Sequence, residues 1–201
     1  MTLRYYTFLF ILGLSGALLL SAFQPAPGYM DSEYYFATAM RIAGGKGFSE
    51  PFLWNYLDDP QNIPHPSHAY WMPLTSLLAA AGMRVFGTFT YLAAQSGFLL
   101  LAGLISPLTA LLSYRLNRDR FLAILSGLLA VFSVFYLPFL VVTDTFAIYM
   151  LLGVLFFLLL SPSPTLPRTP APGLKHHRFF LPLLLGLIAG LMHLSRADGV
   201  L

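Results

Sequence analysis

The chain has 201 residues, of which 57% are hydrophobic and only 9% are charged. Soluble domains average roughly 25% charged residues, so the few acids and bases present cannot form the polar surface of a soluble fold of this length. The net charge of +3 is spread along the chain, which excludes the clustered basic face of a nucleic-acid-binding protein, and without cysteine the chain can form neither disulfides nor cysteine-based metal sites. The composition indicates an integral membrane protein, whose lipid-facing surface can be as apolar as its interior.

Several apolar segments are long enough, or nearly so, to cross a bilayer as helices, which takes about 20 residues. They are residues 5–22, 90–114, 121–142, 146–161 and 179–195. The first could instead be a secretory signal, but the residues around Ala22 form a poor cleavage site and further spans follow. The sequence therefore predicts an all-α fold, a polytopic transmembrane helical bundle of about five spans, in which residues 1–201 form a single transmembrane domain.

The basic residues predict how these spans are oriented. They concentrate in two loops, one with Arg115, Arg118 and Arg120 and the other with Arg168, Lys175 and Arg178. The positive-inside rule places both loops and Arg4 in the cytoplasm. The N-terminus is then cytoplasmic, residues 24–88 form an extracytoplasmic loop, and every acid except Asp119 lies on the outer side.

Two helices are expected to lie on the membrane surface within this loop. Residues 31–44 have an amphipathic pattern that closes at Gly44-Gly45. Residues 72–86 are apolar and could be a sixth span, but a crossing there would turn both basic loops outward. We therefore predict an interfacial helix, held by Trp71 at one end and Arg84 at the other.

The outer loop also contains candidate functional side chains. Asp31 begins the first surface helix, where a carboxylate can act purely as an N-cap or can take part in chemistry. Between the two surface helices lie Asp58, Asp59, His65 and His68, residue types that either bind a divalent cation or form a solvated surface.

Two further acids adjoin predicted spans, where a carboxylate is costly and therefore a functional candidate. Asp144 lies between Thr143 and Thr145, which could satisfy it locally. Asp198 follows the last span, and Arg196 could either neutralise it or bind a phosphate.

The order of these features is similar to that of a known enzyme family. The motifs are Gly28-Tyr29-Met30-Asp31-Ser32-Glu33, Gly44-Gly45-Lys46-Gly47, His65-Pro66, Trp71-Met72-Pro73-Leu74, Thr143-Asp144 and Arg196-Ala197-Asp198-Gly199. Along nearly all of its length the chain resembles the GT-C superfamily of polyprenyl-phosphate-sugar-dependent glycosyltransferases, and most of all the bacterial relatives of protein O-mannosyltransferases and lipid A aminoarabinose transferases. Because it stops directly after a span, we expect it to be the N-terminal part of a longer module.

The resemblance implies an activity and a set of site residues. Asp31 and Glu33 would be catalytic, with Asp31 deprotonating the acceptor hydroxyl or holding a divalent metal ion. The substrate-binding residues implied are His65, His68, Asp144, Arg196 and Asp198. The partners would be a lipid-linked sugar donor and membrane lipids, and the location the plasma (inner) membrane.

The sequence departs from the family pattern at two points. The family commonly has adjacent Asp-Glu where this chain has Asp31-Ser32-Glu33. It also often has a Lys before a Pro-Pro pair, and here either His65 or His68 would replace that Lys at the lipid phosphate or the contact would be lost. Two alternative functions stay open. A transporter would use Asp144 and Asp198 in an ion path, although no paired halves are visible. The chain could also be a truncated, inactive remnant of a glycosyltransferase.

Overall fold

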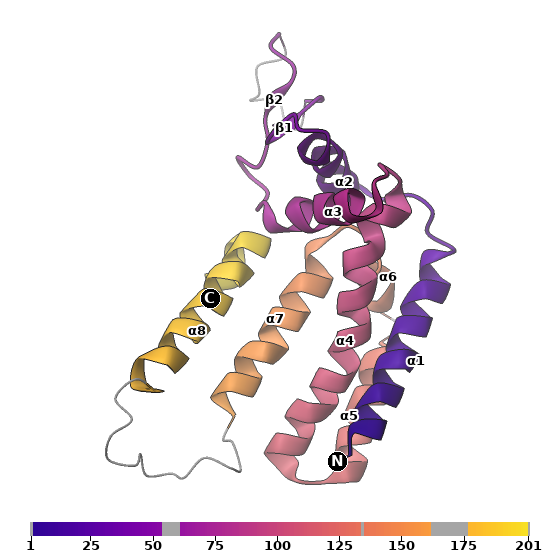
Figure 1. Ribbon diagram of the computed structural model, residues 1–201, viewed down its shortest axis with the longest axis vertical. Coiled ribbons are helices and arrows are strands. Elements are labelled where there is room, and N and C mark those ends of the chain that lie inside the picture. The colour runs from indigo at the N-terminus through magenta and orange to yellow at the C-terminus, as the bar shows by residue number, and fades with distance from the viewer. Residues whose placement is uncertain (1, 54–60, 134, 162–176, 201) are drawn as a thin grey trace.

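The computed structural model describes residues 2–53, 61–133, 135–161 and 177–200, and this part of the chain is mostly helical, which confirms the all-α prediction. The long helices run roughly parallel to one another (Figure 1). They are α1 (Leu3–Ser21), α4 (Tyr91–Asn117), α5 (Arg120–Val131), α7 (Thr145–Leu160) and α8 (His177–Ser195). Helices α1, α5 and α8 run in one direction along the bundle, and α4 and α7 run in the other (Figure 1).

Two helices lie across one end of this bundle, α2 (Met30–Ala43) and α3 (Leu74–Phe86). Both occur where the sequence predicts surface helices. Gly45, with φ of 76°, follows the end of α2, and Gly87, with φ of 65°, caps α3. Positive φ at these points favours glycine. Beyond α2 lies a short antiparallel ribbon of β1 (Ser49–Glu50) and β2 (His65–Pro66), in which Glu50 faces His65.

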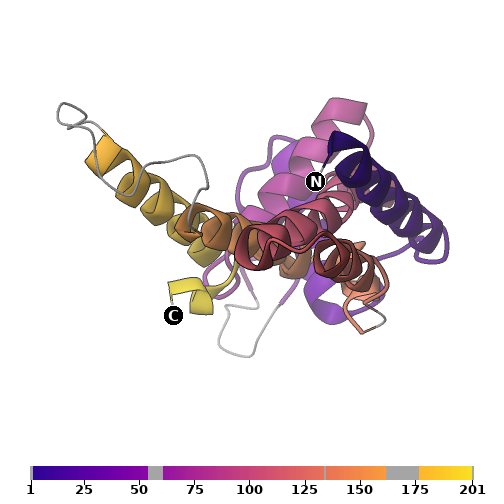
Figure 2. The same ribbon diagram turned by 90° about the horizontal axis from the view of Figure 1, so that it is seen from below.

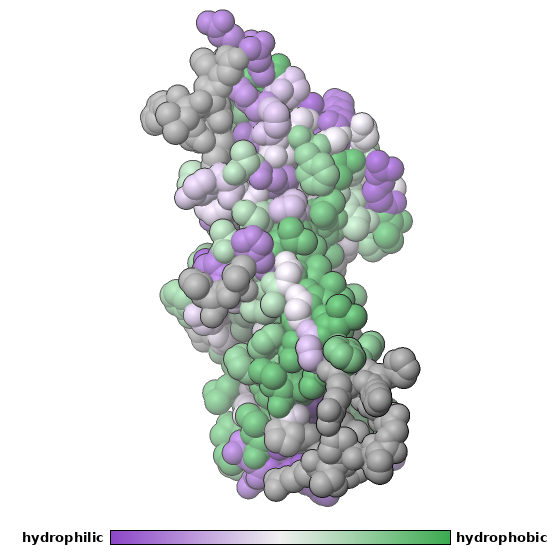
Figure 3. All heavy atoms as spheres, turned by 90° about the vertical axis from the view of Figure 1, so that its left-hand side faces the viewer, coloured by the Kyte–Doolittle hydropathy of each residue, from purple (hydrophilic) through white to green (hydrophobic). Residues whose placement is uncertain are grey.

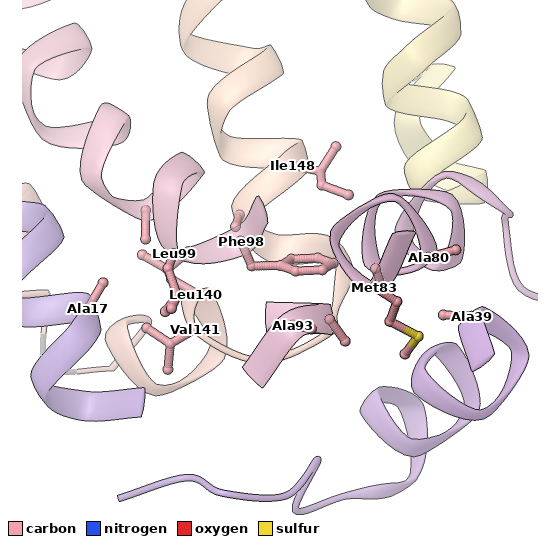
Figure 4. Packing of buried hydrophobic residues seen from close by; sticks show 14 of the residues in the cluster. Ala17, Ala39, Ala80, Met83, Ala93, Phe98, Leu99, Leu140, Val141 and Ile148 are labelled. Carbon is pink, nitrogen blue, oxygen red and sulfur yellow. The ribbon is translucent and has the colours of Figure 1, made fainter. Parts of the chain in front are cut away.

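The core is built around α4, which contacts α1, α3, α5 and α7. Its side chains Phe98 and Leu99 pack among residues of the neighbouring helices, including Ala17, Met83 and Ile148 (Figure 4). Many positions in this core are alanine or glycine, which lets the helices approach closely. The same cluster includes Ala39 of α2, Ile148 of α7 and Ile188 of α8, so one core joins these helices.

The number of spans differs from the prediction. Within the described ranges, only α1 and α4 are long and apolar enough to cross a membrane, rather than about five helices. Helices α5 and α7 have 12 and 16 residues, and the apolar stretch Phe179–Ser195 of α8 also falls short. The predicted segment 121–142 is divided because α5 ends at Val131 and α6 (Leu137–Leu140) starts afresh with Pro138 in its first turn, a position that proline tolerates.

The end of the bundle opposite α2 and α3 is basic. Arg115, in the last turn of α4, donates a hydrogen bond of 2.8 Å from Nη1 to the Leu158 carbonyl oxygen near the end of α7. A cation beside the last carbonyls of a helix is favourable, because the helix dipole is negative there. Arg118 and Arg120 flank Asp119 in the turn between α4 and α5, and α1 starts at the same end of the bundle (Figure 1).

Candidate functional site

A cavity of about 380 Å³ lies where the first turn of α2, the N-terminus of α7 and the C-terminus of α8 meet, below Tyr70–Met72. We call it the polar cavity. Its charged lining residues are Asp31, Asp144, Arg196 and Asp198. All four are sequence-predicted site residues, and they come from segments that are far apart in the chain.

Asp31 lies in the first turn of α2 but does not cap the helix. The N-cap residue is Tyr29, and the Asp31 carboxylate accepts no hydrogen bond from any residue in the described ranges. Partial burial raises the pKa of Asp31 above its usual value, the negative charge of Asp144 raises it further, and the positive charge of Arg196 partly opposes both. The carboxylate is therefore unengaged and more basic than an ordinary aspartate.

Asp144 is the buried acid of the polar cavity, with only 3% of its surface exposed. It caps α7, accepting a hydrogen bond from the Thr145 backbone N–H, and it accepts a second from the Tyr29 hydroxyl. Burial and the nearby carboxylates raise the pKa of Tyr29, so its hydroxyl stays protonated and remains a donor. These partners and the positive end of the α7 dipole compensate the buried carboxylate.

The start of α7 is also tied to α2 and α8. The Thr143 hydroxyl donates to the Ser32 carbonyl oxygen at 2.9 Å, and the Ser195 hydroxyl donates to the Thr145 carbonyl oxygen at 3.4 Å. Of the two threonines expected to satisfy Asp144 locally, Thr145 does so through its backbone N–H, whereas the Thr143 hydroxyl bonds to α2 instead. The Thr143 and Ser195 hydrogen bonds fix the positions of α2, α7 and α8 relative to one another around the polar cavity.

Arg196 and Asp198 form an ion pair at the rim of the polar cavity. Arg196 donates two hydrogen bonds, at 3.0 Å from Nε and at 3.2 Å from Nη2, to the two Asp198 oxygens. The pair lowers the pKa of Asp198 and raises that of Arg196. The expected neutralisation is thus present, but both side chains are about half exposed, so water competes for the pair and the guanidinium can exchange partners.

The remaining predicted residues lie outside the polar cavity. Glu33 is exposed and does not line it, and His65 is buried in β2. His68 is half-buried behind the lining residues Tyr35 and Trp71, with its ring stacked on Tyr35 and Nδ1 donating to the Trp71 carbonyl oxygen at 3.0 Å.

The predicted metal site gains no support from the geometry. Asp58 and Asp59 lie outside the described residues. The described part of the chain has no group of three or more side chains of the types that hold a metal ion. In the polar cavity each oxygen of Asp144 accepts a hydrogen bond, and the Asp198 carboxylate is paired with Arg196.

The hydrogen bond from the Tyr29 hydroxyl to Asp144 was not predicted from the sequence, in which Tyr29 was noted only as a member of a motif. Tyr70 and Trp71 were likewise assigned no position relative to the acids, although both line the polar cavity. A contact across 115 residues, as between Tyr29 and Asp144, leaves no trace in local spacing. No protein-family model matches this sequence, and no similar curated protein or solved structure was found.

Proposed function

We propose that this protein is an integral membrane glycosyltransferase that moves a sugar from a polyprenyl phosphate to an acceptor hydroxyl on the extracytoplasmic face. One observation carries the proposal. Asp31, a carboxylate of raised pKa with no hydrogen-bond donor among the described residues, lines the same cavity as the exchangeable guanidinium of Arg196, at one end of an apolar helix bundle. The resemblance of the sequence motifs to the GT-C superfamily supports the same reading.

Exposed apolar side chains support the membrane setting. Large hydrophobic residues are exposed along each long helix, among them Phe8, Ile11, Leu100, Phe121, Leu129, Phe157, Leu183 and Leu187. Figure 3 shows apolar residues covering much of the face that carries α8, with polar residues gathered beyond them at the end formed by α2 and the ribbon. An apolar surface of this extent is unfavourable in water and suits lipid.

We extend the proposal to the orientation of the bundle. Helices α1 and α4, which are long and apolar enough to do so, cross the membrane in opposite directions, and the shorter apolar helices α5, α7 and α8 lie in the same bundle (Figure 1). The positive-inside rule places Arg115, Arg118 and Arg120 in the cytoplasm of a cell whose plasma membrane holds the protein. The polar cavity then opens at the outer surface, with α2 and α3 lying on that surface.

The proposed reaction uses two groups of the polar cavity. The Asp31 carboxylate takes the proton of the acceptor hydroxyl as the oxygen attacks the anomeric carbon of the donor sugar. The bond between that carbon and the phosphate oxygen breaks, and the polyprenyl phosphate leaves as an anion. Arg196 receives the phosphate by exchanging its Asp198 partner for it, and Asp144 keeps the start of α7 in place.

A matched pair of variants tests the role of Asp31. Asp31→Asn removes the base, whereas Glu33→Gln removes an exposed acid in the same turn of α2 that does not line the polar cavity. With purified protein and a panel of polyprenyl-phosphate sugars, we expect Asp31→Asn to lower transfer by about 10²- to 10⁴-fold. Glu33→Gln should transfer at the wild-type rate.

Three results would contradict this proposal. Full transfer by an Asp31→Asn protein that unfolds at the wild-type temperature would remove Asp31 from the chemistry. Equal losses in the two variants would point to a general effect of charge. No transfer by the wild-type protein from any donor in the panel would reject the glycosyltransferase assignment.

A further inference from the structure

A second hollow, of about 390 Å³, lies at the C-terminal end of α2, and its described lining carries two cations and no acid. The cations are Arg41, in the last turn of α2, and Lys46, in the loop that follows. Phe89, in the connection between α3 and α4, also lines the hollow. We call these three residues, together with the neighbouring Arg84, the cationic corner.

The way α2 ends brings the two cations together. Gly45 has φ of 76°, and the backbone N–H of Lys46 donates to the Arg41 carbonyl oxygen at 2.9 Å, as in a Schellman motif. This motif turns the chain back over the last helical turn, so Lys46 lies beside Arg41. The Ser49 hydroxyl fixes the loop, because it accepts a hydrogen bond of 2.6 Å from Arg41 Nε and donates one of 3.1 Å to the Lys46 carbonyl oxygen.

The two positive charges are not neutralised within the described ranges. There the Nη atoms of Arg41 and the ammonium group of Lys46 have neither a hydrogen-bond acceptor nor an ion-pair partner. Glu33 is exposed a little over two turns before Arg41, about 12 Å along α2, and Glu50 is buried in β1. Cations held together without an acid repel one another, so an anion bound between them stabilises this arrangement.

Exposed apolar side chains surround the same place. Val85, Phe86 and Phe89 are each more than half exposed. Arg84 precedes them, and its Nη2 donates to the Ile42 carbonyl oxygen at 3.4 Å, which joins the end of α3 to the end of α2. Cations next to exposed aromatic and aliphatic side chains are typical of a segment that lies among lipid head groups.

We infer that the cationic corner binds the phosphate of an anionic phospholipid in the outer leaflet, with Phe89 against the start of its acyl chains. The inference rests on the proposed membrane setting and orientation, but not on the proposed transfer reaction. A soluble anion would use only the charges of Arg41 and Lys46, whereas a lipid also covers the exposed apolar side chains. Charge complementarity and the apolar surroundings together therefore favour the lipid.

The cationic corner lies at the far end of the surface helices from the polar cavity. The Ser76 hydroxyl donates to the Tyr35 carbonyl oxygen at 3.1 Å, and the Arg84 hydrogen bond joins the helix ends, so α2 and α3 run side by side in the same direction. Both start at the polar cavity beside α8, and α3 ends beside α1, where Phe86 and Leu18 line one hollow. Helices α8 and α1 lie on opposite sides of α4 (Figures 1 and 2). A lipid bound at the cationic corner would thus anchor α2 at the end away from the polar cavity.

Photocrosslinking of the full-length protein in nanodiscs tests which lipid contacts the cationic corner. The variants are Phe89→p-benzoylphenylalanine and, as the control, Phe23→p-benzoylphenylalanine, because Phe23 is exposed just after α1 with no charged residue beside it in the chain. The nanodiscs contain equal amounts of phosphatidylglycerol and phosphatidylcholine, and mass spectrometry measures the adducts of each. The ratio of phosphatidylglycerol to phosphatidylcholine at position 89 should exceed that at position 23 by at least about fivefold, the factor for one cation near an anionic lipid surface.

Charge variants made with the crosslinker at position 89 test which side chains cause this preference. Lys46 is exposed, so Lys46→Gln should lower the ratio without changing the melting temperature. Adding Arg41→Gln should bring the ratio down to that at position 23, whereas Arg41→Lys keeps the charge and should keep the ratio. An unchanged ratio in the doubly neutralised protein would overturn the inference.

Other outcomes would also overturn it. Equal ratios at the two positions would show that the cationic corner does not prefer the anionic lipid. Loss of the phosphatidylglycerol adduct when inorganic phosphate replaces sodium chloride at equal ionic strength would assign the site to a soluble anion. A crosslink from position 89 to a second copy of the chain would make it a protein contact. In each of these cases the proposed transfer reaction stands. Absence of lipid adducts at both positions would overturn the inference together with the membrane setting on which the proposed function depends.

Discussion

The packing of α3 on α4 predicts whether replacing Gly82 with alanine stabilises or destabilises the fold. Gly82 lies where the two helices touch, and a β-carbon there would overlap the Ala93 carbonyl oxygen and lie 2.7 Å from the Ser96 hydroxyl oxygen. The obstacle is backbone, which cannot rotate away. Gly82→Ala must therefore push α3 off α4.

Two opposing contributions set the size of this effect. Overpacking of a close contact costs about 1–3 kcal/mol, and alanine recovers up to ~1 kcal/mol because it is the better helix former. Because the obstacle is backbone, we place the cost in the upper part of its range, at about 2–3 kcal/mol, so the net destabilisation is about 1–2 kcal/mol. For a chain of this length each kcal/mol lowers the melting temperature by roughly 2–4 °C, so we expect a fall of about 2–8 °C.

A second glycine, Gly190, provides the control for this prediction. Gly190 is a helical residue of α8 with open space around it, so Gly190→Ala should raise the melting temperature by a few degrees. Thermal unfolding in detergent, followed by tryptophan fluorescence, measures both variants. Trp71 precedes α3 and lines the polar cavity, so it also reports a displaced α3. A Gly82→Ala protein as stable as the wild type would refute the close contact.

The remaining predictions concern pH. The charge of Asp144 raises the pKa of Asp31, and the charge of Arg196 lowers it. In pH–rate profiles, Asp144→Asn should therefore move the acid limb of transfer activity to lower pH, and Arg196→Gln should move it to higher pH. Shifts of the two variants in the same direction would contradict the electrostatic assignment. Burial lowers the pKa of His68 below its usual 6.5, and its Nδ1 donates to Trp71. The unfolded chain therefore binds the proton more readily, and stability should fall as the pH drops below 6.5 towards the folded pKa. His68→Asn keeps a donor and should flatten this slope between pH 5 and 7, and an unchanged slope would assign it to another group.

Much of the fold follows from local patterns. The apolar segments become helices close to the predicted places, because length and composition act within each segment. The surface helices are equally local, since glycines such as Gly44 and Gly87 end them. The prediction of about five spans is wrong by the criterion of length. Hydropathy alone runs through residues 132–136 without a break and does not register that the helix stops at Val131.

The candidate site was predictable only in part. Asp144 and Asp198 were singled out because a carboxylate beside an apolar span needs compensation, and both line the polar cavity with Asp31. Sequence could not reveal what compensates them. The side-chain partner of Asp144 is Tyr29, 115 residues earlier in the chain, and a tyrosine next to a membrane is equally typical of an interfacial anchor. Glu33 shows the opposite case, because it shares a sequence motif with Asp31 but is exposed and does not line the polar cavity.

The residues that line the polar cavity come from widely separated parts of the chain, and this has a consequence for biosynthesis. A polypeptide is made from its N-terminus, and early segments fold before late ones exist. Asp31 leaves the ribosome among the first residues, whereas Arg196 follows only after α8. Until then Asp144 can already bond with Tyr29, but one wall of the polar cavity is missing. Packing of α8 against α7 is therefore the step that closes the cavity, and a nascent chain arrested before it would carry Asp31 and Asp144 without the positive charge of Arg196.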